Sequence, residues 1–268
     1  MALVLGIDSS TQSTKVEARD IDTGAVVARG NAAHPPTTPP VSEQDPVAWW
    51  AALTEAITQL GDHRVDVVAI SVAGQQHGLV LLDAEGAPLR PAKLWNDTSS
   101  APQAGRLVDT LGAERWANAT GSVPVAAFTI SKLAWVADNE PELLARVARV
   151  MLPHDYLTWR LTGRHVTDRG DASGSGWFDP TSGSVLADLL GEAVGGDGAD
   201  WLDKVPQVLE PTEVVGTISA EAAEALGLPT DVVIGPGSGD NMGAALGLGL
   251  RSGDVAISLG TSGTVFAV

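Results

Sequence analysis

The sequence predicts an α/β fold with a mixed sheet and helical insertions, followed by the first hairpin of a second, similar domain. Short apolar runs typical of buried strands open the chain, and apolar residues at helical spacing fill its middle. A strand–turn–strand pattern at the start returns at the end. With 268 residues and 44% hydrophobic content, the chain is long enough for one large or two small domains with real cores.

The first strands are expected at Leu3–Ile7, Lys15–Asp20 and Ala25–Gly30. The first run is apolar throughout, and Asp22-Thr23-Gly24 supplies a tight turn between the other two. Three strands in direct succession predict an antiparallel meander and not a strand–helix–strand unit.

A helix and a buried strand are expected next. Asp45 should cap a helix that has Pro46 at its first position. Val67–Val72 is continuously apolar, so it delivers the polar segment Gly74-Gln75-Gln76-His77-Gly78 to the carboxyl end of a buried strand. A returning strand is expected at Leu79–Leu82.

The second half of the chain is expected to be helical first and rich in glycine later. Residues 98–164 show helical spacing, and residues 193–200 are typical of a flexible surface loop. Ser219 should cap a helix that Gly227 ends. A strand, a glycine-rich turn and a small-residue helix are then expected at Val232–Ile234, Gly235–Asp240 and Asn241–Leu250.

The end of the chain repeats the pattern of its start. Ser258–Thr264 resembles Leu5–Thr11, since each segment places glycine and small hydroxyl residues in a turn beside a strand. Chance is the alternative, because such turns are common. A lone hairpin cannot bury a core, so we expect residues 1–250 to form one domain and residues 251–268 to begin a second. On this interpretation the chain is cut from a longer protein.

Composition argues against several function classes. The net charge of −17 opposes binding to nucleic acid or an anionic membrane, and no apolar run reaches the roughly 20 residues of a membrane helix. The chain has no cysteine, no Gly-x-x-x-x-Gly-Lys-Ser/Thr loop and no Gly-x-Ser-x-Gly motif. Its start does not have the pattern of a signal peptide, so a cytoplasmic location is expected.

Two aspartates are candidates for chemistry. Asp8 ends the first strand before a Ser/Thr turn, where backbone amides bind phosphate and a carboxylate holds magnesium; turn capping is the alternative. Asp240 follows glycines that leave room for a substrate, and the helix N-terminus it begins should lower its pKa. An ionised carboxylate there can take the proton of a sugar hydroxyl during attack on phosphorus, although a plain helix cap is the alternative.

Two polar segments are candidates for polyol recognition. The side chains of Gln75-Gln76-His77 can both donate to and accept from hydroxyls, and the glycines around them indicate that something docks closely. Trp95-Asn96-Asp97 would add an aromatic wall and two polar groups, although a turn explains Asn-Asp equally well. His63, His154 and His165 share no spacing with carboxylates that indicates a metal site.

These motifs resemble those of the FGGY carbohydrate kinase family, within the actin/hexokinase/Hsp70 superfamily. They occur in order over essentially the whole chain, at Gly6–Lys15, Ser42–Pro46 with Trp49-Trp50, Gly74–Gly78, Leu94–Asp97, Leu152–Leu157, Leu161–Gly163, Gly237–Asn241 and Ser258–Gly263. The resemblance implies a ribonuclease-H-like first domain that holds the sugar. It also implies a second domain that holds most of the ATP.

The resemblance implies a reaction as well, namely ATP-dependent phosphorylation of D-xylulose to D-xylulose 5-phosphate with Mg²⁺. Gln76 and His77 match the segment of members that act on D-xylulose, where members that act on glycerol carry an Asn-Gln-Arg-Glu-Thr type segment. Asp240 matches the catalytic base, and Asp8 matches the metal-associated carboxylate. The other implied site residues are Trp95, Asn96, Asp97 and Asn241 for the sugar, and Ser10, Thr11, Gln12, Lys15, Gly260, Thr261 and Ser262 for the phosphates.

The chain departs from the family pattern at two positions. Methionine is common where Gln76 stands, and Ser99 stands where an arginine usually follows Trp-Asn-Asp. One alternative is therefore another kinase of the family, acting on gluconate, ribulose or glycerol. A second is a sugar-binding module without catalysis, and an Hsp70-like or actin-like assembly protein is disfavoured by Gln-Gln-His. A homodimer is a further expectation.

Overall fold

The computed structural model describes residues 1–259 and 263–268. Its central sheet starts with the predicted antiparallel meander of β1 (Leu3–Ser9), β2 (Ser13–Asp20) and β3 (Val26–Ala33). Alternate residues of β1 and β2 are buried, which is the period expected for strands with one face on a core.

The other half of the sheet begins with β5 (Val67–Gly74), which pairs with β1 in parallel. Beyond it lie β14 (Val233–Ile234) and β13 (Gly216–Thr217), giving the strand order β13-β14-β5-β1-β2-β3. The short strand β15 (Ser238–Gly239) pairs with the carboxyl end of β5, on the side away from β1. The sheet is therefore mixed, as predicted.

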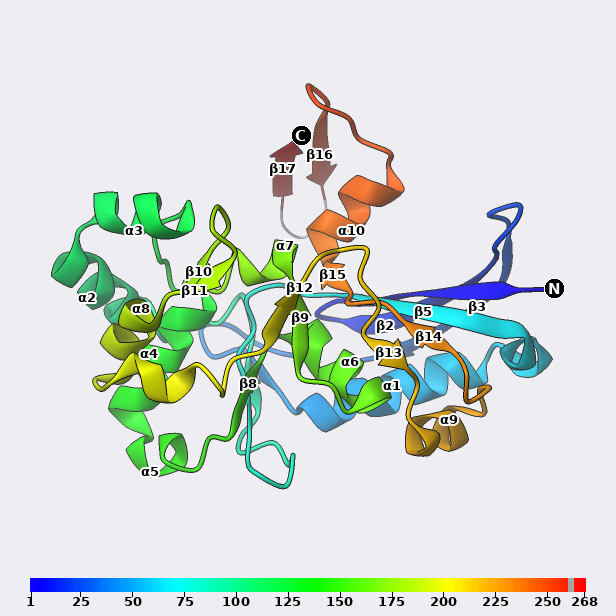
Figure 1. Cartoon of the computed structure of the whole chain (residues 1–268), viewed down its shortest axis with the longest axis horizontal. Helices are drawn as coiled ribbons and strands as arrows, with labels where there is room; N and C mark the ends of the chain where they lie inside the picture. Colours follow the sequence, from blue (N-terminus) through cyan, green and yellow to red (C-terminus); the bar gives the residue numbers. More distant parts are fainter. Residues whose placement is uncertain (260–262) are drawn as a thin grey trace.

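Three helices cover one face of this sheet, namely α1 (Pro46–Thr58), α6 (Pro153–Thr162) and α9 (Ala220–Leu226), seen below it in Figure 1. The predicted start of α1 is confirmed, because Asp45 Oδ1 accepts a hydrogen bond from Val47 N at 2.9 Å. The apolar faces of these helices bury the main hydrophobic core against the sheet.

A second core lies among helices that follow the strand β7 (Ala92–Lys93) in the chain. The predicted helical region is confirmed as α2 (Ala101–Leu111), α3 (Ala113–Thr120), α4 (Thr129–Asn139) and α5 (Pro141–Leu144). The other short elements are η1 (Gly61–Asp66), β4 (Glu43–Gln44), β6 (Val80–Leu82), β8 (Arg149–Met151), β9 (Val166–Asp168), α7 (Arg169–Ala172), β10 (Phe178–Asp179), β11 (Ser184–Val185), α8 (Ala187–Val194), η2 (Gly198–Trp201) and β12 (Gln207–Leu209).

The surface loop predicted over residues 193–200 is confined to residues 195–197, which are exposed. The rest of the predicted stretch forms the end of α8 and the start of η2, and Gly198 is buried against α8. A Cβ at Gly198 would lie 1.7 Å from the carbonyl oxygen of Ala187, so glycine is required for close backbone packing there.

The contact between β3 and α1 gives a test of packing. A Cβ at Gly30 would lie 1.8 Å from the carbonyl oxygen of Ala56, a backbone atom that cannot rotate away. We expect Gly30→Ala to lower the free energy of unfolding by about 1–3 kcal/mol through overpacking. Gly6→Ala in β1, where a Cβ meets nothing within 4 Å, is the matched control. Equal urea midpoints for the two variants would contradict this packing.

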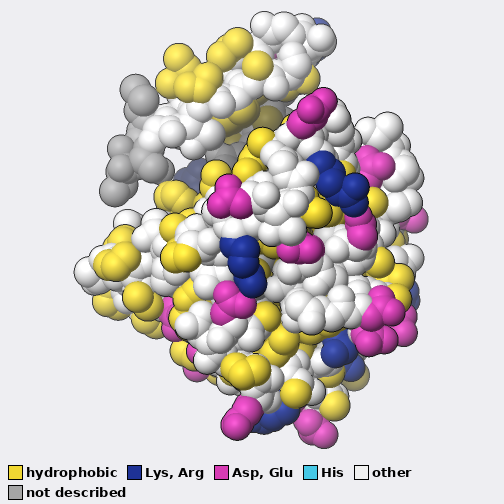
Figure 2. Space-filling model, turned by 90° about the vertical axis from the view of Figure 1, so that its left-hand side faces the viewer, with side chains coloured by type: hydrophobic (Ala, Val, Ile, Leu, Met, Phe, Trp, Pro, Cys, Tyr) yellow, Lys and Arg dark blue, Asp and Glu magenta, His cyan; other side chains and the backbone are white. Residues whose placement is uncertain are grey.

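The last described elements project from the body of the molecule. They are α10 (Asp240–Gly247) and the hairpin of β16 (Val255–Leu259) and β17 (Gly263–Ala267), at the top of Figure 1. Hydrophobic side chains gather on this projecting part in Figure 2. The exposed ones are Leu246 at 84%, Val265 at 68% and Ile257 at 66%, values that leave most of each side chain in contact with solvent. No helix in the described part of the chain has the length and apolar character to cross a bilayer.

Candidate active site

Three strand ends meet at one edge of the central sheet. Asp8 of β1 lies opposite Ala73 of β5, and Ser238 of β15 lies opposite the same Ala73 from the other side. Because Asp240 comes two residues after Ser238, the two candidate catalytic aspartates flank the end of β5. The structure thus brings together two residues that are 232 positions apart in the sequence.

Asp240 is the first residue of α10, and its carboxylate accepts a hydrogen bond from Asn241 N at 2.8 Å. Burial raises the pKa of Asp240 to about 6, and the charges of Asp8 and Asp171 add to the increase. The Asn241 N–H acts in the opposite direction but does not compensate. The prediction that the helix N-terminus would lower this pKa was therefore wrong, although a group with a pKa of about 6 is still mostly ionised at neutral pH.

Gln76 connects the helix that Asp240 begins to the end of β5. Its Oε1 accepts a hydrogen bond from Asn241 Nδ2 at 2.8 Å, and its Nε2 donates to Asp171 Oδ1 at 3.4 Å. The residues predicted to hold the sugar, Gln76 and Asn241, therefore touch each other beside the predicted base.

His77 has an unusual backbone, with a φ of 61° in the left-handed region. Its Nδ1 lies 3.1 Å from the carbonyl oxygen of Gly174, and its ring packs against Phe128 with 5.1 Å between the centroids. Burial lowers the pKa of His77, so the neutral imidazole is favoured at pH 7. A strained backbone on a side chain held from two sides is typical of a functional position.

The glycines around these segments have a role different from the predicted one. A Cβ at Gly78 would lie 2.5 Å from Pro153 Cγ, and one at Gly74 would lie 2.9 Å from His154 Cβ. A Cβ at Gly239 would lie 2.7 Å from the side chain of Gln76. The expectation that these glycines leave room for a ligand was wrong, because neighbouring protein atoms occupy that space.

The turn between β1 and β2 carries the predicted phosphate-binding residues. Ser10 N donates to Ser13 O at 3.1 Å and closes the turn. The Thr11 hydroxyl donates to Gln75 Oε1 at 3.2 Å and accepts from Trp95 Nε1 at 2.9 Å. Thr11 thus ties this turn to the two segments predicted to bind the sugar.

Two further predicted residues stand at the exposed side of the same turn. Gln12 is exposed, and Lys15 Nζ lies 3.3 Å from Asp8 Oδ2, where both side chains remain accessible. The second predicted phosphate turn, Gly260, Thr261 and Ser262, lies outside the described residues.

Asp97 was predicted to offer a polar group to the sugar, but its side chain is not accessible. It is fully buried, and its carboxylate accepts hydrogen bonds from Ser42 N at 2.9 Å and Ser99 N at 3.0 Å. Lys93 Nζ lies 3.5 Å from the same carboxylate. Asp97 therefore holds its loop in place, whereas Asn96 is only partly buried.

A buried cluster of charged groups below the site was not predicted from the sequence. His154 Nε2 lies 3.2 Å from Asp168 Oδ1, 3.3 Å from Asp155 Oδ1 and 3.3 Å from Asp171 Oδ2. Burial by itself would lower the pKa of His154, but the three aspartates raise it well above its ordinary value. The available signal was local: a His-Asp pair at the start of one helix and two aspartates three positions apart at another.

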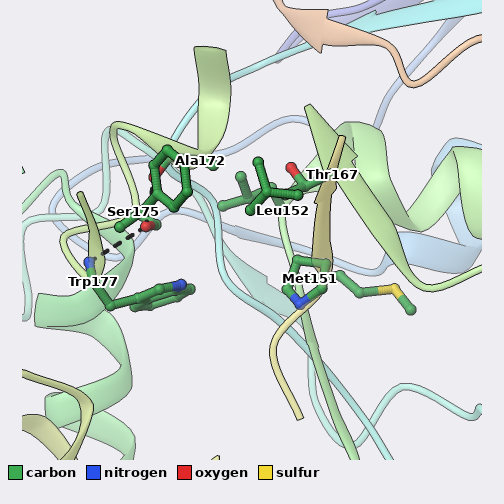
Figure 3. Close-up of a pocket in the computed structure, with 9 residues that line it drawn as sticks. Met151, Leu152, Thr167, Ala172, Ser175 and Trp177 are labelled. Carbon is green, nitrogen blue, oxygen red and sulfur yellow. Dashed lines mark hydrogen bonds between the residues drawn. The ribbon is translucent and has the colours of Figure 1, made fainter. Parts of the chain in front are cut away.

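A small cavity lies beside this cluster, and Figure 3 shows its lining residues. Met151, Leu152 and Thr167 contribute to its wall, and Trp177 N donates to Ser175 Oγ at 3.4 Å next to it. It has room for about one water molecule, which is far too little for a sugar.

This fold and this arrangement of residues define the class of protein. Residues 3–247 match the N-terminal domain of the FGGY family of carbohydrate kinases, and the chain belongs to that family. The actin/hexokinase-like fold predicted from the sequence is confirmed by solved FGGY structures.

Several relatives are xylulose kinases. The one from Streptomyces rubiginosus is 51% identical over 267 residues, which cover 99% of this chain and 54% of that protein. The Escherichia coli xylulose kinase is 38% identical over 271 residues, with coverage of 99% and 54%. The crystal structure of xylulose kinase from Bifidobacterium adolescentis matches with a TM-score of 0.89 at 42% identity, covering 99% of this chain and 59% of the other. The chain spans about half the length of the curated relatives it matches.

Proposed function

We propose that this chain supplies the sugar site and the catalytic base of a kinase that transfers the γ-phosphoryl group of ATP to D-xylulose. The observation that carries the proposal is that Asp240 lies beside Asn241 and Gln76 on one side of β5, with Asp8 on the other. The similarity to xylulose kinases supports D-xylulose as the sugar. The product is D-xylulose 5-phosphate.

In this proposal Asp240 accepts the proton of the attacking hydroxyl as that oxygen approaches phosphorus. A carboxylate with a pKa of about 6 is mostly ionised at pH 7 yet more basic than an exposed aspartate, which suits a general base. Gln76 and Asn241 bind the sugar through their amides, and His77, Trp95 and Asn96 complete its surroundings. Water must be kept out during transfer, since it would otherwise compete for the phosphoryl group.

The residues at the β1–β2 turn fit ATP phosphates and Mg²⁺. Asp8 is a half-exposed carboxylate close enough to raise the pKa of Asp240, so a cation between phosphates and Asp8 would relieve that repulsion. The described residues contain no group of three or more acidic or histidine side chains able to hold a metal ion by themselves. A Mg²⁺ held by Asp8 together with phosphates and water would neutralise charge on the transferring group. Lys15, Ser10, Thr11 and Gln12 are proposed to contact the phosphates.

We also propose that residues 1–250 form the sugar-binding domain and residues 251–268 the first strands of an ATP-binding domain. Exposed apolar side chains on both α10 and the β16–β17 hairpin support this division, because such side chains are usually covered by packing. For this chain alone, a sugar-binding module without turnover is the second candidate function, favoured by its covering only about half of its relatives.

The test of the proposed function is a coupled assay of ADP release on the full-length protein encoded by the gene. D-Xylulose is expected to give the highest kcat/KM in a panel with D-ribulose, gluconate and glycerol. A preference for another sugar would contradict D-xylulose as the substrate but would leave the proposed kinase activity intact. If no sugar increased ADP release, both the proposed substrate and the proposed kinase activity would be overturned. Calorimetry on residues 1–268 is expected to detect D-xylulose binding without ATP turnover.

The pH dependence of kcat/KM tests the role of Asp240. The base acts only when it is deprotonated, and burial raises its pKa to about 6. We therefore expect kcat/KM, which reports the pKa of the free enzyme, to be level above about pH 7 and to fall about tenfold per pH unit below pH 6. Direct measurement of product, with the circular dichroism of the protein checked at each pH, separates this from unfolding. A level profile down to pH 4.5 would exclude Asp240 as the base.

A further inference from the structure

Two groups accept from the Gln76 amide nitrogen, namely the carboxylate of Asp171 and, also at 3.4 Å, the sulfur of Met242, of which the carboxylate is the stronger acceptor. Asp171 is fully buried, and its Oδ1 lies 3.4 Å from Gln76 Nε2. In this contact the Gln76 amide nitrogen donates and the Asp171 carboxylate oxygen accepts, so the nitrogen of Gln76 points toward Asp171. The Gln76 oxygen then points to Asn241 and accepts a hydrogen bond from Asn241 Nδ2 at 2.8 Å.

The orientation of Gln76 determines which atom Asn241 presents to the proposed sugar site. With the Asn241 nitrogen committed to Gln76, the Asn241 oxygen becomes the acceptor end of this series of amides. An acceptor of fixed position selects a ligand group that donates, such as a hydroxyl. If Gln76 were free to rotate by 180°, Asn241 would rotate with it, and the site would present a donor in place of an acceptor.

Asp171 is itself held on its other side. Its Oδ2 lies 3.3 Å from His154 Nε2, and the backbone N–H of Asp171 donates to Asp168 Oδ1 at 3.2 Å. Asp168 also lies 3.2 Å from His154 Nε2, so the imidazole joins α6 to the start of α7. The raised pKa of His154 favours its protonated, cationic form at neutral pH.

We propose that Asp171, anchored by His154, is a positioning residue that fixes the amides of Gln76 and Asn241 for recognition of a sugar hydroxyl. The inference rests on the proposed function, since it assigns Asn241 to the sugar. Asp171 acts through Gln76 and does not touch the substrate. A purely structural role for Asp171 would alter stability without a selective effect on the sugar.

The test is a double-mutant cycle in the full-length protein with Gln76→Glu, Asp171→Asn and the two combined. In Gln76→Glu two carboxylates face each other, and we expect the KM for D-xylulose to rise at least tenfold with the KM for ATP unchanged. The double variant restores a donor opposite an acceptor, because the introduced asparagine amide donates to the introduced glutamate carboxylate. It should recover the KM to within about threefold of the wild type, a coupling in the range measured for contacting residues. Asp188→Asn, an exposed carboxylate paired with Arg115, is the control with no expected change.

The outcomes separate this inference from the proposed function. If the wild type does not phosphorylate D-xylulose, the proposed function fails first. If the wild type is active but the two changes are additive in the KM for D-xylulose, the positioning role is overturned. Should Gln76→Glu not fold, Asp171→Leu alone decides, because leucine, unlike asparagine, offers no acceptor to the Gln76 nitrogen. The inference requires its KM for D-xylulose to rise about threefold or more at unchanged KM for ATP, and an unchanged value refutes it.

Discussion

Asp240→Asn is expected to lower kcat for D-xylulose phosphorylation by about 10²–10⁴-fold, the range that loss of a general base typically costs. Asparagine has nearly the same shape, but its oxygen is a far weaker base than a carboxylate. The hydrogen bond from Asn241 N to this side chain can persist, because the asparagine oxygen still accepts it. The KM for the sugar should therefore change much less than kcat.

Steady-state assays of the full-length protein over a range of D-xylulose concentrations give both parameters. Asp188→Asn again serves as the matched control, since it removes the same charge from an exposed side chain that is 57% accessible and far from any proposed role. A kcat within fivefold of the wild type would remove Asp240 from the chemistry. An equal loss in the control would attribute the effect to charge in general.

The main elements could be predicted because their signals are local. The apolar run at Val67–Val72 and the Asp45-Pro46 start of α1 lie within a few residues of the structure they specify. The polar segment after β5 could also be placed, since a buried strand must deliver its next residues to an edge of the sheet. The convergence of Asp8 and Asp240 could not be obtained from spacing and came only with the resemblance to a family.

The features that escaped prediction all depend on distant contacts. Gly74 and Gly78 indicate a close approach, but only the fold shows that protein and not ligand approaches them. The direction of the pKa shift of Asp240 depends on burial and on Asp8 and Asp171, which are near it only in space. His154 has one carboxylate beside it in sequence and two more supplied by another segment. Local periodicity in the sequence contains no information on the combined effect of burial and of charges from residues that are distant in the chain.

His154→Leu is expected to lower the free energy of unfolding by about 3–5 kcal/mol at pH 7.5, as when one partner of a buried ion pair is removed. The variant leaves Asp155, Asp168 and Asp171 buried without their shared cation. Burial already raises the pKa of Asp155 to about 7 with the imidazole present. Leucine would fill much of the space of the imidazole. The loss in the free energy of unfolding therefore reports mainly the removal of the charge and not the creation of a cavity.

The pH dependence of the loss in stability separates an effect of charge from an effect of a cavity. The pKa of His154 is raised on folding, so its stabilisation is complete below its ordinary value of 6.5 and is lost as pH rises through the raised value. In the leucine variant the carboxylates can be buried only with protons, which become costly to retain as pH rises. Lowering the pH from 7.5 to 5 adds one proton to His154 in the folded wild type at most, whereas in the variant it helps to protonate up to three buried carboxylates. The second effect involves more protons, so the difference in the free energy of unfolding between wild type and variant should shrink in urea titrations.

His165→Leu is the matched control for this experiment. That histidine is partly buried, its pKa is lowered by burial, and its Nε2 makes one contact, 2.9 Å from the carbonyl oxygen of Val150. Loss of one hydrogen bond should cost about 1 kcal/mol at pH 7.5, and this cost should shrink toward pH 5, because the lowered pKa of His165 makes the folded wild type lose stability as pH falls below 6.5. A loss for His154→Leu that equals the control at every pH would mean that the imidazole is not the cation holding the three aspartates. The anchoring of Asp171, and with it the orientation of Gln76 toward the sugar, would then need another source.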